Sequence, residues 1–218
     1  MALIAKESGG GTFTPVPQGM HLARCYRVVD LGTQKSEYLG TVKNLPKVML
    51  QFEVHGEDED GKAIVTAKNE PMTISKNFTL SLAEKATLRK DLQTWRGREF
   101  TQEELRGFEL KNVLGAWAMI SVIKAAGANG KEYTNIAAIM SVPPAIKKAG
   151  LPEGFNTPSI FSIDEPDMTM FDTFSDGLKQ KISGSPEWQA RNGQAPARQQ
   201  APVPSGSGFD DMDDDIPF

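Results

Sequence analysis

A chain of 218 residues has room for one domain of ordinary size with appendages, or for two small domains. Its hydrophobic fraction of 39% can supply a core, but the apolar residues are concentrated before about Pro152, so we expect one domain and an appended C-terminal third. With one cysteine, Cys25, and two distant histidines, His21 and His55, the sequence excludes a disulfide framework and a zinc ribbon, and we expect no cofactor or metal.

Charge is distributed unevenly along the chain. Residues 1–150 contain 20 Lys and Arg against 16 Asp and Glu, a net charge of +4, whereas residues 151–218 contain 4 against 12, a net charge of −8. This asymmetry is typical of a polyanion-binding body with an acidic interaction tail. For the small excess of the body alone, chance scatter of surface charge is an equally good explanation.

The start of the chain bears on its location. Met1 to Lys6 lacks the charged and apolar regions of a signal peptide, and no stretch approaches 18 consecutive apolar residues. We therefore expect a cytoplasmic protein that has no membrane partner.

The N-terminal part predicts an arm followed by a long strand. Residues 1–19, rich in Gly and Pro from residue 8, should form a flexible arm, and its glycines lack the Gly-Lys-Ser/Thr of a phosphate-binding loop. His21 to Leu31 reads as a long strand, with a bulge where the alternation slips at Val28-Val29.

The next two strands form a predicted hairpin. Alternating apolar residues at Val48, Leu50, Phe52 and Val54 mark a half-buried strand. The pair Asp60-Gly61 is a turn signal, and residues 63–67 and the strand 72–80 follow it.

A helix and a second hairpin complete the body. Ser81 with Glu84 forms a capping box, so we expect an amphipathic helix over 82–96, whose apolar stripe is Leu88, Leu92 and Trp95. A shorter capping signature at Thr101 and Glu104 ends at Gly107. Strands over 114–125 and 132–142 should pair through an Asn129-Gly130 turn.

This element order predicts a mainly β fold. Three strands, one helix and a closing hairpin are the order of a five-stranded OB-fold barrel, with one helix between strands 3 and 4, and we place this domain at residues 20–145. Other small β-barrels share parts of the order.

The C-terminal third divides into three segments. Residues 146–188 should be a helical extension packed on the barrel, since Met170, Phe171, Phe174, Leu178 and Ile182 recur at helical spacing and Ser185-Pro186 begins a last turn. Residues 189–208 are almost entirely Gln, Ala, Pro, Gly, Ser and Asn, which predicts a disordered linker. Residues 209–218 form a disordered acidic tail.

The tail combines charge with large apolar groups. Five aspartates lie between Asp210 and Asp215, and by themselves they predict only a solvated end. Ile216 and Phe218 have no role in a purely solvating tail. We expect a partner protein to bind the Phe ring in an apolar pocket and the terminal carboxylate with Arg or Lys. The expected partner-binding residues are Asp213, Asp214, Asp215, Ile216, Pro217 and Phe218.

The last ten residues, Phe-Asp-Asp-Met-Asp-Asp-Asp-Ile-Pro-Phe, resemble the C-terminal tail of bacterial and bacteriophage single-stranded DNA-binding proteins (SSB). The resemblance implies an OB-fold body that binds and protects single strands, and a tail that recruits replication, recombination and repair proteins. The longer stretch between strands and the region 143–188 depart from the bacterial pattern. They favour a phage-encoded variant, acting in the bacterial cytoplasm, and leave homo-oligomer formation open.

Single-strand binding requires aromatic faces for the bases and cations for the phosphates. In the closing hairpin we expect Ala118, Ile120, Val122, Ile136, Ala138 and Met140 to face inward, which leaves Trp117 and Tyr133 as stacking residues. Aromatic residues on strands also fill cores, and that is the alternative for each one. The full set of expected DNA-binding residues is Arg24, Tyr26, Lys35, Lys43, Lys76, Phe78, Arg96, Arg98, Trp117, Lys124, Lys131 and Tyr133.

Two other functions stay open from the sequence. A recombination mediator or strand-annealing protein shares the affinity for single strands but assembles into rings or filaments. A DNA-processing enzyme is less consistent with the sequence, because the acidic clusters lie in a predicted turn, residues 57–60, and in the tail, rather than on a rigid frame. We therefore expect no enzymatic activity and assign no catalytic residue.

Overall fold

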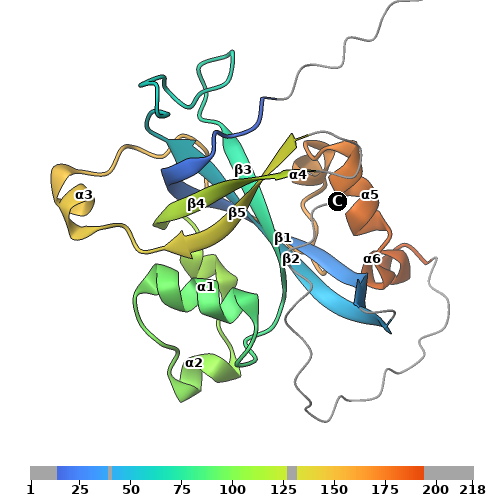
Figure 1. Ribbon diagram of the computed structural model, residues 1–218. Helices are drawn as coiled ribbons and strands as arrows, with labels where there is room; N and C mark the ends of the chain where they lie inside the picture. Colours follow the sequence, from blue (N-terminus) through green and yellow to red (C-terminus); the bar gives the residue numbers. More distant parts are fainter. Residues whose placement is uncertain (1–13, 39–40, 127–131, 194–218) are drawn as a thin grey trace, which may run out of the picture.

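Strands and short helices alternate along the chain in the computed structural model, which describes residues 14–38, 41–126 and 132–193 (Figure 1). The strands are β1 (Gly19–Tyr38), β2 (Thr41–His55), β3 (Thr73–Thr79), β4 (Trp117–Ala126), β5 (Glu132–Met140) and β6 (Ser159–Phe161). The helices are α1 (Thr87–Arg96), α2 (Gln102–Arg106), the 3-10 helix η1 (Leu110–Val113), α3 (Pro144–Ala149), α4 (Met168–Asp172), α5 (Asp176–Ser183) and α6 (Pro186–Arg191).

The strands form one sheet in the order β3-β2-β1-β4-β5, with antiparallel neighbours, and β6 pairs with β1 in parallel. The long strand β1 pairs with β4 over Gly19–Arg24 and with β6 over Arg27–Val29. The chain is therefore mixed α/β and strand-rich, with a six-stranded sheet and several short helices. The strand-rich body with a helix between β3 and β4 agrees with the expectation, but several further short helices make the class mixed α/β rather than mainly β.

A first hydrophobic core covers one face of the sheet. The four alternating residues of β2, Val48 to Val54, are buried there as predicted. The stripe Leu88, Leu92 and Trp95 of α1 packs on them, and the Trp95 ring lies 5.6 Å from the Phe52 ring. The amphipathic pattern of this helix thus placed it correctly against the sheet.

A second core lies on the opposite face of β1 and β2. Val29, Leu31 and Met49 contribute to it from the sheet, and Phe161, Phe171, Phe174, Ile182 and Trp188 contribute from β6 and the C-terminal helices. The segment expected as a helical extension contributes three short helices beside β1 (Figure 1). The part of β2 from Val48 to Val54 is consequently covered on both faces, where the sequence predicted a half-buried strand.

The same two-sided burial explains Val28 and Val29. Val28 packs in the first core and its neighbour Val29 in the second, because both faces of β1 are covered there. The predicted bulge at this pair is wrong. The register shifts lie between Cys25 and Arg27 and between Asp30 and Gly32.

Some helix boundaries differ from the predictions. The helix α1 begins at Thr87, not at residue 82, because Ser81 Oγ accepts from the N–H of Ala83, two residues on, and forms a local turn instead of a cap. The capping box of Thr101 and Glu104 is formed. Ser185 caps α6, with Pro186 in its first turn, and α6 continues to Arg191, inside the range expected as linker.

The C-terminal apolar stripe belongs to two helices rather than one. Residues 173–175 separate α4 from α5, and Ser175 caps α5 by accepting from the N–H of Leu178. Near the N-terminus, Val16 is buried in the first core, so the described end of the predicted flexible arm is packed.

The closing hairpin contains one irregularity that changes its faces. Ser121 pairs with Ala138 but Val122 pairs with Ile136, so Ala137 is an extra residue in β5. Ile139 therefore faces the core, and the expectation that Ala138 and Met140 face inward is wrong. The predicted Asn129-Gly130 turn lies outside the described residues.

The second core predicts a paired outcome for two neighbouring residues of β6. Phe161 is buried against Phe171, Phe174 and Trp188, so Phe161→Ala should lower the free energy of unfolding by about 3–5 kcal/mol. Ile160 is 50% exposed, so Ile160→Ala should change it by no more than about 0.5 kcal/mol. Urea denaturation measures both; equal effects would contradict the packing of the C-terminal helices on the sheet.

Candidate nucleic-acid interface

The outer face of the sheet, opposite the first core, is organised in rows of side chains that cross the strands. One row runs from Thr73 through Glu53 and Arg24 to Trp117. The next row runs from Ser75 through Gln51 and Arg27 to Ser159. A third row contains Met49, Val29 and Phe161 and is covered by the C-terminal helices.

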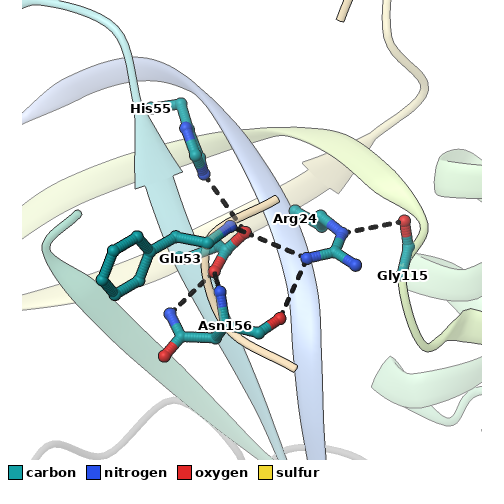
Figure 2. Close-up of polar contacts among 6 residues, drawn as sticks. Arg24, Glu53, His55, Gly115 and Asn156 are labelled. Atoms are coloured by element: carbon teal, nitrogen blue, oxygen red, sulfur yellow. Dashed lines mark hydrogen bonds and ion pairs between the residues drawn. The ribbon is translucent and has the colours of Figure 1, made fainter. Parts of the chain in front are cut away.

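The first row is held by a fully buried carboxylate, Glu53 (Figure 2). Arg24 Nη1 donates to its Oε1 at 3.2 Å, and His55 Nε2 lies at 3.2 Å from the same oxygen. The segment after α3 supplies the other donors: Phe155 N to Oε1 at 3.0 Å, and Asn156 N and Nδ2 to Oε2, each at 2.7 Å. The carboxylate therefore ties residues 155–156 to the sheet.

These hydrogen bonds determine the ionisation of Glu53. Burial alone raises the pKa of the carboxyl, but the hydrogen bonds from the Asn156 backbone and side chain, His55 and Arg24 outweigh it. The pKa is therefore lowered from its usual 4.5. Glu53 is an anion whose charge is compensated within the protein.

Arg24 completes the same network. Its guanidinium also donates to the carbonyl oxygens of Asn156, at 3.1 Å, and Gly115, at 3.4 Å. At Gly154 a β-carbon would lie 1.8 Å from Arg24 Nη1, so only glycine lets the backbone approach the guanidinium this closely. The segment 154–156 is thus closely fitted onto Arg24 and Glu53.

The second row is centred on Arg27. Its guanidinium lies over the Tyr26 ring at 5.3 Å and over the Phe174 ring at 5.6 Å, and its Nε donates to Ser159 Oγ at 3.2 Å. No carboxylate within the described ranges forms an ion pair with it. Arg27 is therefore a positioned, half-buried cation, beside exposed Ser75 and a buried Gln51 oxygen that accepts no hydrogen bond from the described part.

The structure does not support several of the expected DNA contacts. Arg24 is engaged with Glu53, and Lys76 is only 7% exposed, paired with Asp91 at 3.0 Å. Phe78 is fully buried in the first core, and Tyr26 is 6% exposed, so a base cannot stack on either ring. Lys76 and Phe78 do share a face, but it is the inner one.

The two arginines at the end of α1 and just after it, Arg96 and Arg98, are also paired. Arg96 and Arg98 both bind Glu104, and hydrogen bonds from Arg98, the Thr101 backbone and Arg96 lower the pKa of Glu104 to about 2. Arg96 also lies over the Phe100 and Phe108 rings. Their arrangement is that of a structural cluster, in which Arg98 remains the more exposed member.

Other expected residues keep an accessible position. Trp117 is half-buried on the outer face, 4.9 Å from the His55 ring, and Tyr133 is half-buried on the same side of the closing hairpin. Lys35 and Lys124 are exposed and Lys43 is half-buried. Lys131 and the tail residues 213–218 lie outside the described residues.

Two candidate residues were missed by sequence reasoning. Arg27 was not predicted because its position in the strand does not indicate that its guanidinium lies over the Tyr26 and Phe174 rings. Phe155 is 58% exposed, in a segment with no periodicity. The only sequence signal for it is a large aromatic residue between Gly154 and Asn156.

Comparisons with known proteins add no assignment: the chain matches none of the protein-family models and none of the curated proteins with which it was compared. Within the described ranges, no helix is both long enough and apolar enough to cross a membrane.

The Glu53 network predicts a pH-dependent stability. Because the lowered pKa favours the ionised form in the folded protein, the network stabilises fully above pH 4.5 and loses its effect as the pH falls below that value. Glu53→Gln leaves Arg24 without its counter-ion and should lower the free energy of unfolding by on the order of 3 kcal/mol at neutral pH.

Denaturation of the wild type and Glu53→Gln from pH 7 to pH 3 tests this. The difference between them should shrink as the pH falls. Glu59→Gln, at an exposed position, is the matched control and should behave as the wild type does. A constant difference at every pH would show that Glu53 contributes by packing rather than by charge.

Proposed function

We propose that this protein binds single-stranded DNA without sequence preference and recruits replication, recombination or repair proteins through residues 209–218. The observation that carries the proposal is the combination of five aspartates with Ile216 and Phe218 behind a body of net charge +4. A run of aspartates is repelled by phosphate, so this segment serves a protein partner, and the nucleic acid must bind to the body.

The strand order supports an OB-fold for the body. In the proposed barrel, β3 and β5 meet, and the helix between β3 and β4 closes one end. The order β3-β2-β1-β4-β5, with α1 after β3, agrees with this connectivity. A hydrogen bond from Lys76 Nζ on β3 to the carbonyl oxygen of Ala137 on β5, at 3.3 Å, links the two end strands.

Cations on the β1–β2 hairpin support binding of a polyanion. Lys35, Lys43 and Lys47 lie on its two strands, and Lys181 of α5 is close to Lys47. Burial, and then repulsion by Lys47, lowers the pKa of Lys181. A phosphate bound here would relieve that repulsion, so the hairpin is suited to follow a nucleic-acid backbone.

Intrinsic fluorescence gives a direct test of DNA binding. Trp95 and Trp188 are buried and Trp117 is half-buried on the outer face, so a change on adding oligo-dT should report chiefly on Trp117. We expect tight binding, with a salt dependence of slope about 0.7 per phosphate neutralised. Trp117→Phe should remove most of the signal. Weak binding, or equal affinity for duplex of the same length, would contradict the proposal.

The tail has a separate test. Phe218→Ala should leave oligo-dT affinity within about twofold, since a single side chain of the tail does not contact DNA, and should abolish binding to a purified bacterial replication or repair enzyme. The matched control is Val203→Ala, at the large aliphatic residue of the linker. Surface plasmon resonance measures both. Undiminished enzyme binding by Phe218→Ala would overturn the assignment of the tail.

A further inference from the structure

Phe155 is the aromatic residue most open to solvent among the described large hydrophobic side chains. The residue is 58% exposed, whereas the other large, exposed hydrophobic residues of the described part are aliphatic or methionine. An exposed Phe costs free energy in water unless a ligand covers it. Single apolar residues are common on protein surfaces, so it is the way in which this one is held that suggests a site.

The backbone that carries this ring is held at several points. Phe155 N and Asn156 N both donate to the buried Glu53 carboxylate, and the Asn156 carbonyl accepts from Arg24. The close approach of Gly154 to Arg24 fixes the preceding residue. An exposed ring on a backbone held in this way loses little conformational freedom when a ligand binds, which is what a stacking residue requires.

Arg27, which has no acidic partner among the described residues, lies in the neighbouring row. Gln51, which pairs with Arg27, is two residues from Glu53 on the same face of β2, so the two rows are about 7 Å apart along the strand. Because Phe155 N donates to Glu53, the segment that carries the ring is attached to the row next to that of Arg27. Arg27 is held between two rings and its guanidinium has nitrogen donors beyond the Nε that Ser159 uses.

We propose that Phe155 and Arg27 form a nucleotide-binding subsite on the outer face of β1 and β2, in which the Phe155 ring stacks on a base and Arg27 binds an adjacent phosphate. Glu53 is a positioning residue, which acts by holding residues 154–156. The subsite rests on the proposed function. It adds to the DNA-binding surface residues 154–156, which follow β5 in the chain. The exposed polar residues Thr73 and Ser75 at the end of these rows favour a nucleotide over an apolar protein surface.

The first experiment compares oligo-dT affinities. The wild type is titrated first, and if it does not bind, the proposed function fails independently of the subsite. Where it binds, Phe155→Ala should weaken binding by roughly 5- to 150-fold, the range for loss of one stacked base. Phe155→Trp should retain affinity. Met168→Ala, at a similarly exposed residue, should bind as the wild type does. If Phe155→Ala also does so, the subsite is wrong while the proposed function stands.

The salt dependence separates the two roles. Phe155→Ala should weaken binding at every salt concentration with an unchanged slope, since no phosphate contact is lost. Arg27→Gln should reduce the slope by about 0.7, and Arg27→Lys should restore it. Thermal unfolding of each variant shows whether loss of the Tyr26 and Phe174 contacts has disturbed the fold. An unchanged slope for folded Arg27→Gln would remove Arg27 from the subsite.

The third experiment tests whether residues 154–156 position the ring. Gly154→Ala places a methyl group against Arg24 and should displace Phe155, so it should weaken binding in the wild type but add little to Phe155→Ala. Gly107→Ala, where a β-carbon meets nothing within 4 Å and φ is 179°, is the control. Full additivity of Gly154→Ala and Phe155→Ala would show that Gly154 acts elsewhere and that the ring needs no such positioning.

Discussion

The central parts of β1 and β2 are covered on both faces, and the rest of the structure depends on this. The first core packs on one face, and β6 with the helices α4 to α6 packs on the other. A sheet covered on both faces can display ligand-binding side chains only where one cover ends and the next begins. The row of Arg27 lies at that place, between the Glu53 row under residues 154–156 and the part of the sheet under the C-terminal helices.

A buried charge holds the first of these rows. The ionised Glu53 would be costly in the interior without its five donors, which come from three parts of the chain: Arg24 of β1, His55 of β2, and residues 155–156 after α3. A carboxylate with fixed acceptor directions sets the geometry of that segment more narrowly than apolar packing does. The interaction that joins the extension to the sheet therefore also fixes the backbone of Phe155.

Features that depend on residues close together in sequence were predicted correctly. The alternation of Val48 to Val54, the stripe of Leu88, Leu92 and Trp95, and the caps at Thr101 and Ser185 were all found, because each is determined by neighbours within a few residues. The position of the C-terminal helices was harder to predict. Their helical character was predicted, but the face of β1 on which they pack was not. That gap led to the error at Val28-Val29, where burial on two faces resembles a bulge.

Candidate binding residues were harder to predict because charge pairing is non-local. Arg24, Lys76, Arg96 and Arg98 all have carboxylate partners in the structure, and the partners of the first two lie far away in sequence. In the net charge each of these residues counts as a cation, but in the structure a carboxylate compensates its charge. The unpaired charge available to phosphate is therefore smaller than the composition implies, and under the proposed function more of the affinity must come from stacking on exposed rings. Because a duplex hides the faces of its bases, a protein that depends on stacking discriminates single strands from duplex even when its net positive charge is small.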